Sequence, residues 1–186
     1  MKSRQVYFWL ALLFLAGGIW YWWHSRRGDH RYDKIIRAAA VRYEISPALI
    51  KAVVWRESRF HSTARGRAGE IGLMQIRSLA GKEWAQAEHV LSFKDDDLLD
   101  PVTNILVGSW YLKKLLKRYR QTNNPLSYAL ADYNAGRSNV LRWNRGNAAT
   151  NSAMFMEQIT FAGTKEYVQA VTRRYEFYKP EFSKRF

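Results

Sequence analysis

Apolar residues follow two different patterns along the 186-residue chain. Residues 6–23 form one apolar run without a formal charge, whereas from residue 32 onward apolar positions recur at steps of three and four. The positions after Asp100 show this spacing: Val102, Ile105, Leu106, Leu112 and Leu116. Such spacing is typical of one face of an amphipathic helix. The two patterns predict a mainly α-helical domain that follows a single hydrophobic N-terminal helix.

Three prolines mark predicted helix starts, because each directly follows a residue that favours the helix N-cap. The pairs are Ser46-Pro47, Asp100-Pro101 and Asn124-Pro125, and proline at the first helical position costs no hydrogen bond. The predicted helices cover residues 33–43 and 47–57, one or two short segments within 72–88, about five turns after Asp100, a stretch from Pro125, and a stretch from Thr164 to just before Pro180. Neither alternating strands nor a repeat is found, so residues 32–186 are expected to form one domain.

The N-terminal apolar run is just long enough to cross a membrane. Its 18 residues lie between Lys2 and Arg4 on one side and Arg26 and Arg27 on the other, and about 20 apolar residues span a bilayer as a helix. Aromatic residues at 20–23 suit the headgroup interface. We therefore predict a membrane anchor with a basic tether over residues 1–31. A cleavable signal peptide is the competing interpretation, and basic residues at both ends leave the orientation open.

Composition and spacing argue against several kinds of chemistry. The chain has 30 Lys and Arg against 16 Asp and Glu, a net charge of +14, and it has no cysteine. Its four histidines are not spaced as a helical metal pair, and neither glycine-rich nucleotide-binding pattern occurs. We therefore predict no metal site and no cofactor. The positive charge favours anionic surfaces, such as phospholipid headgroups or the peptide carboxylates of a cell wall.

One carboxyl group is unusual in its setting. Glu57 follows the apolar residues 52–55 and precedes Ser58-Arg59-Phe60, so it is expected at a helix end beside an apolar surface. Loss of water around a carboxyl group raises its pKa toward neutral pH, which is the condition for a general acid. A Glu at a helix end is more often a solvated residue, so its position alone leaves both interpretations open.

Four short motifs follow one another in a specific order. They are Glu57-Ser58-Arg59-Phe60, the GEIGLMQI sequence of residues 69–76, Asp100-Pro101 with Asn104-Ile105 and Gly108, and Tyr133-Asn134-Ala135-Gly136. Over about 130 residues this order and spacing resemble the soluble lytic transglycosylase family, lysozyme-like enzymes that cleave peptidoglycan. The resemblance implies a lysozyme-like helical fold and a catalytic domain over residues 32–186.

In that family a single Glu is the catalytic acid and base, and by match this residue is Glu57. The resemblance implies that Glu57 protonates the oxygen between N-acetylmuramic acid (MurNAc) and N-acetylglucosamine (GlcNAc), and then takes the proton of the muramoyl C6 hydroxyl. That hydroxyl closes onto C1, so the product is a 1,6-anhydro sugar and the enzyme is a lyase. The sequence shows no second carboxylate in a comparable setting, because the run Asp95-Asp96-Asp97 is more typical of a solvated loop.

The same match implies substrate-binding roles for seven further residues. Ser58 is expected to orient Glu57 or to contact the substrate, and Gly72 to let the backbone approach the sugar. Met74 and Gln75 are expected to line the cleft, and the Tyr133 hydroxyl, beside Asn134, to hydrogen-bond Glu57. Glu157 is the candidate for a substrate-binding carboxylate, because residues 155–161 resemble the family's Glu-x-Ile-Pro-Phe segment with Thr160 in place of the proline. Structural roles stay open for four of them: a helix cap by Ser58, a turn at Gly72, core packing by Met74 and ion pairing by Glu157.

The sequence thus predicts a peptidoglycan lytic transglycosylase anchored in the inner membrane of a bacterium by a single span, with its catalytic domain in the periplasm. Glycan strands are the expected partner, and no nucleic acid is expected. Three alternatives stay open: a hydrolysing muramidase similar to goose-type lysozymes, a basic nucleic-acid-binding protein, and a catalytically silent wall-binding module. The sequence does not distinguish wall turnover from service to a secretion, pilus or phage assembly.

Overall fold

The computed structural model describes residues 5, 7–18 and 30–183, and the chain divides into two units, residues 1–34 and 35–186. In the first unit, residues 7–18 are helical and their side chains are exposed, including Phe8, Trp9 and Phe14. The rest of the predicted anchor and most of the tether, residues 1–4, 6 and 19–29, lie outside the described residues. Within the described part of the chain, no helix combines the length and apolar character that a bilayer crossing requires.

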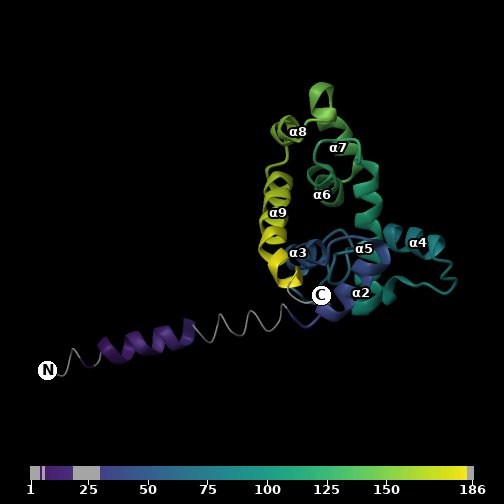
Figure 1. Cartoon of the computed structure of the whole chain (residues 1–186). Coiled ribbons are helices and arrows are strands. Elements are labelled where there is room, and N and C mark those ends of the chain that lie inside the picture. Colours follow the sequence, from purple (N-terminus) through teal and green to yellow (C-terminus); the bar gives the residue numbers. More distant parts are fainter. Residues whose placement is uncertain (1–4, 6, 19–29, 184–186) are drawn as a thin grey trace. The chain divides into compact units, whose positions relative to one another are not determined.

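Helices build most of the described chain from residue 33 onward (Figure 1). They are α2 (Asp33–Tyr43), α3 (Pro47–Ser58), α4 (Ser78–Ala87), α5 (Pro101–Arg118), α6 (Pro125–Ala135), α7 (Arg137–Trp143), α8 (Ser152–Gln158) and α9 (Ala162–Ser183), with the 3₁₀ turns η1 (Asp95–Leu99) and η2 (Gly146–Ala149). Between residues 30 and 183 there is no strand. Two isolated bridges, Arg65 with Ile71 and Ile71 with Ile76, fold the loop between α3 and α4.

The predicted mainly helical fold is confirmed, and several predicted boundaries agree with the structure. The helix α2 has the predicted range, and α3, α5 and α6 begin at the three predicted prolines. Of the three cap residues, Asp100 accepts a hydrogen bond from the backbone N–H of Thr103 at 2.8 Å, whereas Ser46 and Asn124 form no such side-chain cap. The fixed φ of proline therefore marks these starts more consistently than the cap side chain does.

Two predicted boundaries are wrong. Helix α4 begins only at Ser78, because Gly72 and Gln75 have φ values of +79° and +49°, which a right-handed helix cannot include. Helix α9 continues through Pro180 to Ser183. Proline removes one backbone hydrogen bond there, but the last turn is held by packing: Phe182 is buried and Glu181 pairs with Lys51 at 3.0 Å.

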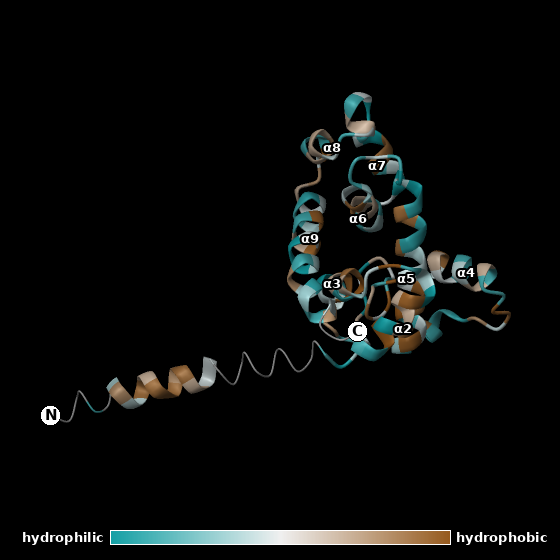
Figure 2. Cartoon of the chain, viewed as in Figure 1, coloured by the Kyte–Doolittle hydropathy of each residue, from teal (hydrophilic) through white to brown (hydrophobic). Residues whose placement is uncertain are grey.

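The core forms around α3 and α6. Ile50, Ala52, Val53 and Val54 of α3 are fully buried, and α3 packs along α9. Helix α6 lies between α5 and α9 and contacts both (Figure 1). Figure 2 shows hydrophobic residues on α3 and α6 and hydrophilic residues along much of α9. The burial of these apolar faces fixes the ends of α3, α6 and α9 relative to one another.

A buried amide connects the loop between α3 and α4 to α5. Asn104 has no exposed surface; its Oδ1 accepts from the Met74 N–H at 2.8 Å, and its Nδ2 donates to the carbonyls of Ile71 and Leu98 at 2.8 and 2.7 Å. A Cβ at Gly72 would lie 2.2 Å from this Nδ2. The glycine is therefore required for the amide to reach the loop.

Replacement of Asn104 by Ala is expected to lower the free energy of unfolding by about 3 kcal/mol, because three hydrogen bonds of roughly 1 kcal/mol each are lost and their loop partners stay buried. Urea denaturation measures this change. Asn147→Ala, at an exposed position in η2, is the matched control and should change stability by less than about 0.5 kcal/mol. A loss below about 1 kcal/mol in Asn104→Ala would contradict the role of the amide.

Candidate active site

A cleft of about 980 Å³ lies at the C-terminal end of α3. Its walls are Glu57, the loop before α4, residues of α4 and α5, the end of α6 and the first residue of α7. The volume is at the upper end of the roughly 300–1,000 Å³ that small-molecule sites occupy. The cleft therefore has room for several linked sugar or peptide groups.

Glu57 reaches this cleft because its helix ends abruptly. The backbone of Arg59 takes a left-handed conformation, φ 50°, and its N–H closes the helix on the carbonyl of Trp55 at 3.2 Å. Phe60 follows with φ 65° and is buried. The chain thus turns away directly after Ser58 and leaves Glu57 in the last turn of α3, half-buried beside the core.

Burial sets the protonation of Glu57. Loss of water around the carboxyl raises its pKa from 4.5 to about 7, and the negative charge of Glu70 acts in the same direction. A hydrogen bond from Tyr167 and the charge of Arg56 act against this shift, and burial outweighs both. Glu57 is therefore about half protonated at neutral pH, so it can give up and take back a proton there.

The hydroxyl that contacts Glu57 belongs to Tyr167 of α9, which donates to Oε1 at 2.5 Å. The prediction that Tyr133 makes this bond is wrong, because the Tyr133 hydroxyl donates to the backbone carbonyl of Met74 at 2.8 Å. Tyr133 still lines the cleft, and the charge of Glu57 raises the pKa of both tyrosines, in addition to the larger effect of their burial. Each tyrosine therefore stays a hydroxyl donor at neutral pH.

The GLMQ segment is divided between core and cleft. Met74 is fully buried and packs against Gly108, where a Cβ would lie 2.3 Å from its Sδ, so its side chain packs in the core and not in the cleft wall. Gly72 is buried against Asn104 and lies outside the lining. Gln75 does line the cleft, but its Nε2 donates to the carbonyls of Gly72 and Ala64 at 2.9 and 3.2 Å. Within this segment, only Gln75 faces the space beside Glu57.

The remaining predicted residues lie in different environments. Ser58 is buried and donates back to the carbonyl of Val54 at 3.2 Å, so the structure does not place it in the cleft. Asn134 lines the cleft and accepts from the Thr164 hydroxyl at 2.8 Å, a contact between α6 and α9. Glu157 is exposed on α8, outside the cleft lining. The cleft thus unites Glu57, Gln75, Tyr133 and Asn134 but not Ser58, Gly72, Met74 or Glu157.

The charges of the side chains that line the cleft are balanced. Five basic and five acidic side chains line it, and two of these pairs are direct: Lys114 with Glu83 at 2.7 Å and Arg118 with the buried Asp132 at 2.6 Å. The rings of Tyr111 and Tyr133 lie 5.6 Å apart. Aromatic rings and paired charges present both apolar and hydrogen-bonding surface, as a carbohydrate requires.

The motif analysis assigned no role to three residues of this region: Tyr167, which contacts Glu57, and Tyr111 and Glu70, which line the cleft. The sequence pattern gave no signal for Tyr167 and Tyr111, because each occupies a position that an apolar residue of an amphipathic helix could fill. Glu70 stands inside the quoted GEIGLMQI sequence, yet its distance of 13 residues from Glu57 gives no signal that both carboxyl groups face one cavity. The positions of α9 and of the loop, which depend on tertiary packing, bring these residues together.

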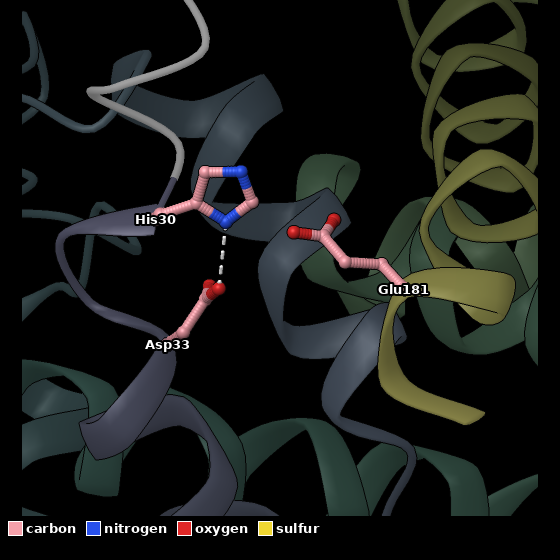
Figure 3. Close-up of side chains that lie close together, drawn as sticks. All are labelled: His30, Asp33 and Glu181. Carbon is pink, nitrogen blue, oxygen red and sulfur yellow. Dashed lines mark hydrogen bonds and ion pairs between the residues drawn. The ribbon is translucent and has the colours of Figure 1, made fainter. Parts of the chain in front are cut away.

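The His and carboxyl groups drawn in Figure 3 lie outside the cleft. His30 Nδ1 is hydrogen-bonded to Asp33 Oδ2 at 2.9 Å, and Glu181 accepts from Lys51 Nζ at 3.0 Å. Among residues 30–183 no histidine lines the cleft, and the potential metal ligands in its described lining are carboxylates.

Tyr167→Phe is expected to raise the pKa of Glu57 above about 7, by about one unit, because the lost hydroxyl stabilises the charged carboxylate. A ¹³C NMR titration of labelled Glu side chains measures this value. Tyr175→Phe, on the same helix but outside the cleft lining, is the control and should leave it unchanged. An unchanged or lower value in Tyr167→Phe would contradict the assigned hydrogen bond.

Comparisons with known proteins identify the family of the chain. Residues 34–156 match the family model described as the transglycosylase SLT domain. The chain is 29% identical over 169 residues to the soluble lytic murein transglycosylase of Escherichia coli (strain K12), covering 89% of this chain and 25% of that protein. It is 34% identical over 131 residues to the membrane-bound lytic murein transglycosylase C of Pectobacterium atrosepticum, covering 64% of this chain and 35% of that protein.

A solved structure shares the fold. An inactive mutant of the lytic transglycosylase Slt from Pseudomonas aeruginosa superposes with a TM-score of 0.75 at 25% identity, covering 83% of this chain and 25% of that chain. The chain thus spans about a quarter to a third of the length of these relatives. Because the family model covers well over half of the chain, the chain belongs to the transglycosylase SLT domain family.

Proposed function

We propose that this chain is a peptidoglycan lytic transglycosylase that cleaves the β-1,4 bond between MurNAc and GlcNAc with Glu57 as its acid and base. The observation that carries the proposal is a half-buried Glu57 with a pKa of about 7, facing a cleft large enough for a glycan. The names of the relatives support the reaction class, and the mutant from Pseudomonas aeruginosa that is called inactive carries Gln in place of a Glu.

In the first step, protonated Glu57 gives its proton to the glycosidic oxygen, and the bond from C1 of MurNAc to that oxygen breaks. GlcNAc leaves with a free 4-hydroxyl. The acetamido oxygen of MurNAc bonds to C1 and spreads the positive charge over an oxazolinium ring, so a second carboxylate is not required as nucleophile. The Tyr167 hydroxyl, which already donates to Oε1, stabilises the carboxylate that this step creates.

In the second step, the Glu57 carboxylate takes the proton of the C6 hydroxyl of MurNAc. The C6 oxygen bonds to C1, the bond from C1 to the acetamido oxygen breaks, and the 1,6-anhydro sugar forms. Glu57 ends the cycle protonated, and no water is consumed. A pKa of about 7 suits both steps, because neither protonation state of Glu57 is strongly favoured at neutral pH.

A hydrolysing muramidase is the second candidate function, and Glu70 is the observation that favours it. Glu70 lines the same cleft as Glu57, and a second carboxylate could activate water for attack on C1. The two reactions differ in their products. A lyase leaves 1,6-anhydro ends, whereas a hydrolase leaves reducing ends.

We further propose that residues 1–31 anchor the catalytic domain of residues 32–186 to the bacterial inner membrane, with that domain in the periplasm. The uncharged run of residues 6–23 supports this. The apolar side chains of residues 7–18 support it as well, because they are exposed and would be buried in a bilayer. The relative from Pectobacterium atrosepticum is named membrane-bound. A net charge of +14 would also favour anionic lipid headgroups.

Glu57→Gln is expected to lower the clearing of purified peptidoglycan at least 100-fold, because Gln cannot transfer the proton. Turbidity of a sacculus suspension measures the rate, and mass spectrometry of the wild-type products should show 1,6-anhydromuropeptides. The variant should melt at pH 8 no lower than the wild type, since Gln does not carry the charge that is costly to bury above pH 7.

Full clearing by Glu57→Gln would exclude Glu57 as the acid. Reducing ends in place of anhydro ends among the wild-type products would replace the lyase with the muramidase.

Deletion of residues 1–23 is expected to move the protein from the membrane pellet to the supernatant after cell fractionation. Clearing of peptidoglycan in solution and the melting temperature should stay as in the full chain, because none of the described residues of the deleted segment, 5 and 7–18, lines the cleft. A full-length chain found in the supernatant would contradict the anchor, and an insoluble truncated chain would show that the run packs against the domain.

A further inference from the structure

Glu70 is a fixed carboxylate on the loop wall of the cleft. Its Oε2 accepts from the backbone N–H of Ala68 at 3.0 Å, and its backbone carbonyl accepts from the N–H of Gly66 at 2.8 Å. A Cβ at position 66 would lie 2.2 Å from this Oε2. The absence of a side chain at Gly66 therefore makes room for the carboxylate, and the turn of residues 66–70 holds it in one place.

The charge of Glu70 is not neutralised by a neighbour. Among residues 30–183, no Lys, Arg or His forms an ion pair with it, whereas Glu83 and Asp132 in the same cleft are each paired with a cation. Asp95 accepts a hydrogen bond from the Ser78 hydroxyl at 2.8 Å. Glu70 thus presents a full negative charge to the space that Glu57 also faces.

Glu57 is surrounded by groups that act in opposite directions. Arg56, beside it on α3, and the Tyr167 hydroxyl from α9 both lower its pKa, while burial and the charge of Glu70 raise it. Tyr133 of α6 also faces Glu57, but its hydroxyl is used by the Met74 carbonyl and is uncharged at neutral pH. Glu70 is therefore the one charged group in this set that favours the protonated acid.

We propose that Glu70 is a positioning residue for the proton of Glu57: its fixed negative charge keeps the acid protonated before cleavage and makes the resulting carboxylate a stronger base afterward. The inference deepens the proposed function, in which one Glu must act first as acid and then as base. A nearby anion increases the fraction of Glu57 that is protonated when the substrate binds, and it strengthens the Glu57 carboxylate as the base of the second step. Glu70 needs no contact with the substrate for this role.

Glu70→Gln tests the proposal with little change in shape, because the Gln oxygen can still accept from the Ala68 N–H. Without the charge, Glu57 should ionise at lower pH. The rate of sacculus clearing at pH 8 should then fall about threefold relative to the wild type, because a pKa of Glu57 lowered by about half a unit reduces the protonated fraction by that factor. The rates at pH 5.5 should stay within experimental error. Asp95→Asn removes a charge from the same cleft without a contact to Glu57, and should leave the pH of half-maximal activity unchanged.

A ¹³C NMR titration of Glu57 in Glu70→Gln separates this inference from the proposed reaction, because it needs no turnover. A lower pKa of Glu57 in Glu70→Gln, with no change in Asp95→Asn, supports the proposal even if the wild-type products carry reducing ends. A titration equal to that of the wild type, or an equal shift in Asp95→Asn, overturns it. So does a change in product type in Glu70→Gln, since that would make Glu70 the base that activates water.

Discussion

The cleft depends on one buried amide. Asn104 holds the backbone of residues 71–74 against α5 through three hydrogen bonds, and this loop places both the carbonyl that fixes Tyr133 and the turn that carries Glu70. Because the amide has no access to water, each bond that it lost would leave a buried group without a partner. The loop wall of the cleft is therefore tied to α5 at residues 71 and 74, although it contains no regular secondary structure.

The environment of Glu57 depends on the packing of α9 on α3. That contact brings the Tyr167 hydroxyl to Glu57, 110 positions away in sequence. The same packing removes water from the carboxyl, and the two consequences compete: burial raises the pKa of Glu57, whereas the hydrogen bond lowers it. The value of about 7 is the balance. A site with burial alone would hold its proton too tightly to release it, and one with the hydrogen bond alone would lose it well below neutral pH.

Local sequence predicts the parts of this fold that depend on local physics. Helix starts at prolines follow from backbone preferences, so they could be read from the chain. The end of α3 was expected near Glu57 from the sequence pattern, but the positive φ values of Arg59 and Phe60 that produce it are unusual for these residues. The hydrogen-bond partner of Glu57 could not be predicted in this way, since Tyr133 and Tyr167 are both tyrosines on helices. Only the position of α9 determines which of the two hydroxyls contacts Glu57. The role of Met74 stayed open for a related reason. A motif indicates that a residue belongs to the family pattern, but not whether its side chain packs in the core or lines the cleft.

The net charge of the chain and the charges that line the cleft have different effects. A net charge of +14 would attract the anionic cell-wall polymer of the proposed function from a distance, within the limits of screening by salt. A cleft of that same sign would oppose a reaction that builds positive charge on the sugar, yet basic and acidic side chains are equal in number there. When Glu57 releases its proton, the cleft gains one negative charge at the moment the sugar gains a positive one. The local balance therefore favours the charge separation that the proposed reaction requires.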